Sequence, residues 1–134
     1  IFFKGFIDAL IKTKVRGKDV FYVIDWKTAG DKGWYRSKRE DILTWAQIAL
    51  YKSFWAKREK IDLKDVRCGF VLLKRGAKQG KTCELVKVSV GPKAEEKSIK
   101  ILRSMVSSVR KGLFLKNRNS CLFCEFKSTV HCPG

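Results

Sequence analysis

Acidic residues are scarce in this chain of 134 residues. Asp and Glu number 13 against 30 Lys and Arg, which gives a formal net charge of +17. The excess is spread along the whole length rather than confined to one tail. A folded domain this basic most often binds a polyanion, with nucleic acid the first candidate and an anionic membrane a distant second. A surface that is merely solvated and basic is disfavoured at this magnitude.

Long apolar runs are absent too, so nothing predicts a membrane span, and no signal-peptide pattern opens the chain. The chain is short enough to form one domain with a single core, and we expect one domain over 1–134. Because the chain starts at Ile1 rather than Met and strand-like sequence begins at once, we expect the domain to be incomplete at its N-terminus. The five cysteines are odd in number and do not resemble a secreted disulfide framework. Cysteine usage therefore predicts a reducing, cytoplasmic compartment.

Residues 20–27 read Val-Phe-Tyr-Val-Ile-Asp-Trp-Lys and predict a buried strand that ends in charged residues. Because side chains alternate along a strand, Asp25 and Lys27 share one face and Ile24 and Trp26 the other. A carboxylate and an ammonium at such a place are costly to desolvate unless something compensates them, and a divalent metal and a phosphate would compensate both. An ordinary solvated Asp/Lys pair is the alternative.

A second carboxylate lies upstream, in the strand-like segment that carries Gly5-Phe6-Ile7-Asp8. Residues 16–19 supply turn residues, so the two segments predict a hairpin that brings Asp8 beside Asp25. Two neighbouring carboxylates repel each other unless they share a proton or a cation. Hard cations are bound by oxygen ligands of this kind.

Three motifs follow in the order Gly5-x-x-Asp8, Ile24-Asp25-Trp26-Lys27-Thr28 and Gln47-x-x-x-Tyr51. In that order and spacing they resemble the PD-(D/E)XK nuclease superfamily, and more narrowly its RecB/AddB-type branch, which includes CRISPR-associated and phage exonucleases. The resemblance implies an α/β, restriction-endonuclease-like fold with a central mixed sheet of about four strands flanked by helices. It also implies Mg²⁺- or Mn²⁺-dependent hydrolysis of single- or double-stranded DNA, by an exonuclease with helicase or recombination partner proteins.

The resemblance assigns roles to individual residues. Asp8, Asp25 and the Trp26 carbonyl would hold the metal, and Lys27 would orient the attacking water or the phosphate. Gln47 and Tyr51 lie on a helix predicted over about 37–60 and would position the reacting strand. Without the upstream motifs, a buried amide and a core aromatic would be the preferred interpretation of this pair.

Two strands, over residues 66–73 and 82–90, flank a basic loop. Its cations are Lys74, Arg75, Lys78 and Lys81. They would bind a phosphate backbone, or equally form an ordinary solvated loop. A further helix is predicted from Pro92, with an apolar face formed by Ser98, Leu102, Met105, Val106, Val109 and Leu113 packed on the sheet.

A cysteine cluster occupies residues 121–132 and contains Cys121, Cys124, His131 and Cys132. Three cysteines and a histidine suit a tetrahedral zinc site. The family resemblance implies a [4Fe–4S] cluster instead, whose fourth cysteine would lie upstream of the nuclease motifs. Free reduced thiols are the least favoured alternative. The functional alternative to a nuclease is a non-catalytic nucleic-acid-binding module stapled by zinc or an iron–sulfur cluster.

Overall fold

The computed structural model describes residues 4–113, 121 and 124–132. The chain forms two compact units, one ending at Arg103 and the other beginning at Ser104. The first unit contains the sheet, and the second contains the end of the last helix and the cysteine tail. The prediction of one nuclease domain over 1–134 stays a prediction.

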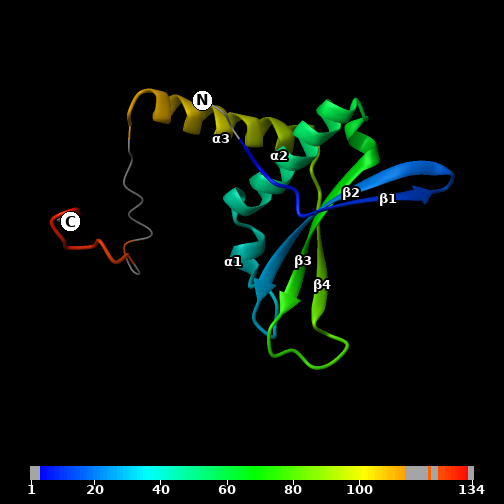
Figure 1. Ribbon diagram of the computed structural model, residues 1–134, viewed down its shortest axis with the longest axis horizontal. Helices are drawn as coiled ribbons and strands as arrows, with labels where there is room; N and C mark the ends of the chain where they lie inside the picture. Colours follow the sequence, from blue (N-terminus) through cyan, green and yellow to red (C-terminus); the bar gives the residue numbers. More distant parts are fainter. Residues whose placement is uncertain (1–3, 114–120, 122–123, 133–134) are drawn as a thin grey trace. The chain divides into compact units, whose positions relative to one another are not determined.

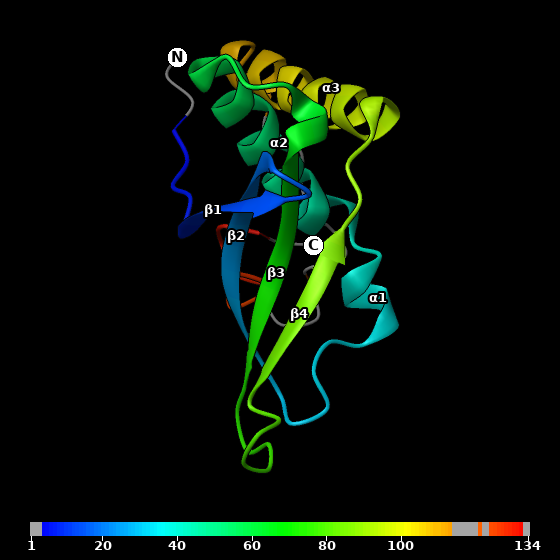
Figure 2. The same ribbon diagram turned by 90° about the vertical axis from the view of Figure 1, so that its right-hand side faces the viewer.

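A mixed sheet of four strands in the order β1-β2-β3-β4 forms the centre of the first unit (Figures 1 and 2). Strand β1 (Ala9–Val15) pairs antiparallel with β2 (Lys18–Ala29). Strand β3 (Val66–Lys74) runs parallel to β2, and β4 (Cys83–Val88) runs antiparallel to β3. The predicted α/β class with a four-stranded mixed sheet is confirmed.

The β1–β2 hairpin turns at Arg16 and Gly17, whose φ angles of 52° and 79° are both left-handed. Two left-handed residues form the tight turn whose twist matches that of paired strands, and such a turn fixes the register. The register pairs Ala9 with Ile24. Asp8 therefore lies one position before the ladder, next to Asp25.

The helix predicted over 37–60 is two helices, α1 (Arg36–Arg39) and α2 (Ile42–Glu59). The break occurs at Asp41, whose side chain accepts hydrogen bonds from the Leu43 and Thr44 amides and so caps α2. Lys60 caps the C-terminus of α2 with a left-handed backbone conformation. The short 3₁₀ helix η1 (Leu63–Asp65) then leads into β3.

Helix α2 lies along one face of the sheet and completes the core (Figures 1 and 2). Ile48 and Trp55 of α2 pack with Val23 of β2 and with Phe70 and Leu72 of β3. Burial of these side chains is the main stabilising contribution, because each removes apolar surface from water. Val23 of β2 points into this core, toward α2. Because side chains alternate along a strand, Asp25 and Lys27 lie on the same face of β2 as Val23.

Helix α3 (Pro92–Arg110) begins at Pro92, as predicted, because proline suits the first helical position. Ser98 is fully buried and its hydroxyl donates to the Ala94 carbonyl at 2.7 Å. Met105, Val109 and Leu113, which were predicted to share a packed face with it, are about half exposed. None of the helices in the described ranges combines the length and apolar character needed to cross a bilayer.

Candidate active site

Asp25 is the buried carboxylate of the site. Its residue is only 3% exposed, and its Oδ2 atom lies 2.7 Å from Lys27 Nζ. The contact has the distance of an ion pair but not the geometry of a hydrogen bond, so within the described residues Oδ2 accepts none. A buried carboxylate oxygen left in this way has room in its bonding for a further positive partner.

Asp8 lies directly before β1, the strand next to β2. Its Oδ2 atom accepts a hydrogen bond of 2.8 Å from the Trp26 backbone amide. Within a strand the N–H and C=O of one residue point to the same edge, so the Trp26 carbonyl also faces the β1 side. The predicted ligands Asp8, Asp25 and the Trp26 carbonyl thus lie around one short stretch of β2.

Lys27 is connected to the third motif through α2. Its Nζ atom donates to Gln47 Oε1 at 3.4 Å, and Gln47 Nε2 donates to the Tyr51 hydroxyl at 3.1 Å. Gln47 and Tyr51 are one helical turn apart and therefore lie on the same face. The structure brings Asp25, Lys27, Gln47 and Tyr51 into one connected series of polar contacts.

The first motif reaches the same place through Gly5. A Cβ atom on Gly5 would lie 2.6 Å from Tyr51 Cε1, closer than side chains tolerate. Glycine therefore permits the segment before Asp8 to pass directly over the Tyr51 ring. All three motifs meet in space.

An apolar cavity of about 310 Å³ opens beside Tyr51. Its walls are formed by Gly5, Ile7, Tyr51, Phe54, Trp55 and Arg58. Aromatic rings with a neighbouring guanidinium are the surface on which nucleobases stack. The cavity thus continues the site from its polar groups toward an aromatic surface.

A divalent metal fits the donor set of this site. Both side-chain ligands are carboxylates, and one of their oxygens is buried without a hydrogen-bond donor in the described part of the chain. Oxygen ligands with this charge suit Mg²⁺ or Mn²⁺ better than soft metals. Water and substrate phosphate would complete the shell, as Mg²⁺ sites commonly require.

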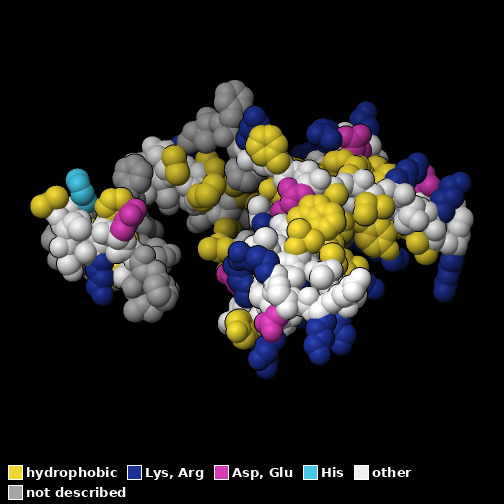
Figure 3. Space-filling model, turned by 60° about the horizontal axis from the view of Figure 1, so that its bottom comes forward, with side chains coloured by type: hydrophobic (Ala, Val, Ile, Leu, Met, Phe, Trp, Pro, Cys, Tyr) yellow, Lys and Arg dark blue, Asp and Glu magenta, His cyan; other side chains and the backbone are white. Residues whose placement is uncertain are grey.

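The basic loop lies beyond the carboxyl ends of β2 and β3, where Ala29 pairs with Lys74. Lys74 is not an open cation, because its Nζ lies 3.5 Å from Glu84 Oε2 and its side chain is 14% exposed. Arg75, Lys78 and Lys81 are exposed. In Figure 3, which brings this end of the sheet forward, Lys and Arg side chains predominate over Asp and Glu.

The cysteine tail is not assembled as a metal centre. Across residues 4–113, 121 and 124–132, no three His, Cys, Asp or Glu side chains come close enough to share a metal ion. His131 instead packs its ring edge-on against Phe126, with centroids 6.2 Å apart. As arranged here, Cys121, Cys124, His131 and Cys132 do not fit a zinc or iron–sulfur site, and that metal stays a prediction.

Lys52 is a residue that the sequence pattern does not single out. It follows Tyr51 on α2, is only 7% exposed, and donates from Nζ to the Val90 carbonyl at 3.1 Å. The available signal is a lysine between the apolar residues of a helix face, which is also consistent with a lysine that extends to solvent. Only the packing in the folded structure distinguishes a buried lysine from one that extends to solvent.

Comparison with known proteins agrees with this geometry. The sequence profile of the PD-(D/E)XK nuclease superfamily matches residues 1–132. No curated protein and no solved structure matches the chain significantly. The match covers the three motifs, the sheet and both long helices.

Proposed function

The chain belongs to the PD-(D/E)XK nuclease superfamily, and from that premise we propose that it is a Mg²⁺- or Mn²⁺-dependent deoxyribonuclease that works from strand ends. Membership itself implies a nuclease with a nucleic-acid substrate. The choice of DNA and of ends is supported by the order of the motifs, which resembles that of RecB/AddB-type exonucleases.

One observation carries the proposal: the buried Asp25 Oδ2, which accepts no hydrogen bond from the described residues, lies 2.7 Å from Lys27 Nζ, and Asp8 contacts the neighbouring Trp26 amide. Asp8, Asp25 and the Trp26 carbonyl would hold the metal. When bound, the metal acidifies a water and neutralises the charge that builds on the scissile phosphate.

The remaining residues position the reactants. The Lys27 ammonium has three donors, of which Gln47 engages one while Asp25 pairs with its charge, and a remaining donor would orient the water or the phosphate. Gln47 restrains that ammonium and is itself held by Tyr51. The aromatic cavity beside Tyr51 would receive the base next to the reacting phosphate, because stacking accepts any sequence.

Exposed cations at the end of the sheet would bind the phosphate backbone. Arg75, Lys78 and Lys81 are suited to this, whereas Lys74 already contacts Glu84. A helicase or recombination partner and a cytoplasmic location follow only from the resemblance and the cysteine usage. Both stay predictions.

The test is cleavage of end-labelled single-stranded DNA, duplex DNA and RNA, with Mn²⁺, with Mg²⁺ or with EDTA. We expect metal-dependent shortening of DNA from an end, and no cleavage of a closed circle. Binding in EDTA should weaken with salt, by a logarithmic slope of about −0.9 per phosphate contact on duplex DNA. Unchanged cleavage in EDTA would contradict the metal-dependent mechanism. Salt-dependent binding without cleavage in the presence of either metal would favour the non-catalytic binding module.

A further inference from the structure

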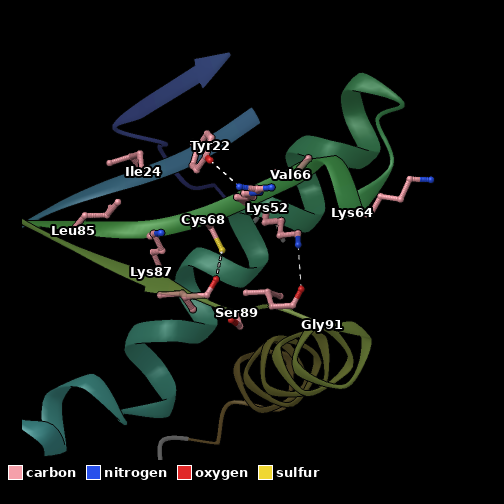
Figure 4. Close-up of a pocket in the computed structure, with 14 residues that line it drawn as sticks. Tyr22, Ile24, Lys52, Lys64, Val66, Cys68, Leu85, Lys87, Ser89 and Gly91 are labelled. Carbon is pink, nitrogen blue, oxygen red and sulfur yellow. Dashed lines mark hydrogen bonds between the residues drawn. The ribbon is translucent and has the colours of Figure 1, made fainter. Parts of the chain in front are cut away.

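A second cavity, of about 420 Å³, lies at the start of β3. Helix α2, the end of β4 and residues 89–91 form its walls (Figure 4). None of the five residues assigned above to catalysis lines it. Of its 14 lining residues none is acidic, and four are cations: Lys52, Lys64, Arg67 and Lys87.

Lys52 is the residue that needs explanation. Its side chain is buried and extends to the Val90 carbonyl, its hydrogen-bond acceptor at 3.1 Å (Figure 4). In the described part of the chain no carboxylate forms an ion pair with it. A buried ammonium without an opposite charge is unfavourable, and one carbonyl leaves two of its three donors for another partner.

The cavity has no internal anion to satisfy this charge. Burial raises the pKa of the Cys68 thiol to about 11, although the Lys52 ammonium opposes that rise. Cys68 is therefore a neutral thiol at pH 7, and its Sγ donates to the Val88 carbonyl at 3.4 Å (Figure 4). The described residues that line the cavity therefore supply no negative partner for Lys52.

Three further cations line the same cavity, and they differ in how available they are to a ligand. Arg67 donates from Nη1 to the Tyr22 hydroxyl at 3.0 Å, and the other guanidinium N–H groups remain for a ligand. Lys87 is exposed on β4, while Lys64 forms an exposed ion pair of 2.7 Å with Asp62. Lys52, Arg67 and Lys87 are thus the three cations through which an anion would be held.

The chemistry and the size together define the ligand. Apolar side chains of Ile24, Val66, Leu85 and Val88 line the cavity beside the cations, together with the Tyr22 ring. A volume of this order accommodates a small organic ligand rather than a bare ion. A phosphate monoester on a planar or apolar group satisfies both features, because the phosphate meets the cations and the base meets the apolar wall.

We propose that this cavity is a nucleotide-binding site, separate from the active site, which takes a 5′-phosphate monoester through Lys52, Arg67 and Lys87. The ligand is either a free mononucleotide or the terminal nucleotide of a strand. The site does not depend on cleavage, so it is tested without metal and its outcome is independent of the proposed nuclease activity.

The test measures binding of deoxyadenosine 5′-monophosphate in EDTA at constant ionic strength, by calorimetry and by the shift in melting temperature. The nucleotide should raise the melting temperature by mass action, and deoxyadenosine without phosphate should not. Lys52→Met should weaken nucleotide binding at least tenfold and, because it removes an uncompensated buried charge, should raise the melting temperature of the free protein. If Lys52 had a purely structural role, Lys52→Met would instead lower the melting temperature of the free protein.

Matched variants separate this site from diffuse charge. Lys57→Met removes an exposed cation from the same helix and should leave nucleotide binding unchanged. Lys87→Gln, on the exposed rim, should weaken binding several-fold and keeps the test open if Lys52→Met does not fold. Equal losses in Lys57→Met, normal binding in both cavity variants, or no binding by the wild type would each overturn the site.

Competition by oligonucleotides identifies the source of the phosphate. Displacement of the nucleotide by a 5′-phosphorylated strand but not by its 5′-hydroxyl counterpart would support a strand terminus. Displacement by neither would support a free mononucleotide. Equal displacement by both would overturn the assignment to a monoester phosphate.

Discussion

The Trp26 backbone amide donates a hydrogen bond of 2.8 Å to Asp8 Oδ2, so a side chain takes the place of the next backbone acceptor in the β1–β2 ladder. β1 begins at Ala9, directly after Asp8. The carboxylate therefore extends the sheet by one hydrogen bond, at the position opposite Asp25. Position and charge of Asp8 are separate properties that two substitutions can distinguish.

Asp8→Asn should keep the contact with Trp26, because an amide oxygen also accepts from a backbone N–H. It should lose metal-dependent cleavage while retaining the wild-type melting temperature. Asp8→Ala should lose metal-dependent cleavage and also the contact with Trp26, with a decrease of about 1 kcal/mol in the free energy of unfolding. Urea titrations alongside cleavage assays measure the two effects. Equal stability of the two variants would contradict a structural role for Asp8.

Asp25→Asn should abolish divalent-dependent cleavage, whereas DNA binding in EDTA should survive or improve because one negative charge is removed. Mg²⁺ should raise the melting temperature of the wild type but not of this variant. Lys27→Ala should reduce the cleavage rate by roughly 10²–10⁴-fold without unfolding the protein. A metal-induced stabilisation that persists in Asp25→Asn would place the metal elsewhere.

Tyr51→Phe removes the hydroxyl that accepts from Gln47 but keeps the ring against Gly5. We expect about a tenfold lower rate at saturating substrate with unchanged stability, because Gln47 then restrains Lys27 less firmly. Gly5→Ala should lower the rate further, since its new Cβ displaces the Tyr51 ring. A Gly5→Ala protein with wild-type kinetics would contradict the contact between the motifs.

Asp41 caps α2, and hydrogen bonds from Thr44, the Leu43 amide and Lys38 hold the pKa of its carboxyl below the ordinary value for aspartate. The ionised form therefore stabilises the fold above the unfolded pKa, and this contribution is lost as the pH falls through the lowered pKa of the folded state. Asp41→Ala should cost about 1 kcal/mol of unfolding free energy at pH 7, less at pH 3. Asp41→Asn, an uncharged cap, should cost less and show little pH dependence, which urea midpoints at both pH values would measure.

Local rules account for what the sequence predicts correctly. A two-residue turn and strand alternation are enough to place Asp8 next to Asp25, and an i, i+4 spacing is enough to put Gln47 and Tyr51 on one helix face. The break at Asp41 is missed because one capping side chain interrupts an otherwise helical pattern.

Contacts between distant segments explain the remaining differences. Lys74 is matched by Glu84 only through the register of β3 and β4, and Lys52 meets its acceptor, the Val90 carbonyl, only through the packing of a distant segment. Neither relationship can be obtained from composition or periodicity. Both change how many cations of a very basic chain are available to a ligand.

The tail already closes on itself through backbone contacts. The Ser128 backbone amide donates to the Cys132 carbonyl at 2.9 Å, and the Lys127 backbone amide donates to the Cys124 carbonyl at 3.2 Å. A bound metal would supply the free energy for the rearrangement that brings the thiolates together.

We therefore predict that protein purified without oxygen carries metal bound through Cys121 and Cys124. Iron–sulfur binding should give a brown protein that bleaches on reduction, and zinc a colourless one with one equivalent of metal. Cys121→Ser with Cys124→Ser should remove the metal and lower the melting temperature, whereas Cys83→Ser on β4 should change neither. A wild type without metal, and with a melting temperature that the double substitution leaves unchanged, would mean that these residues are plain thiols.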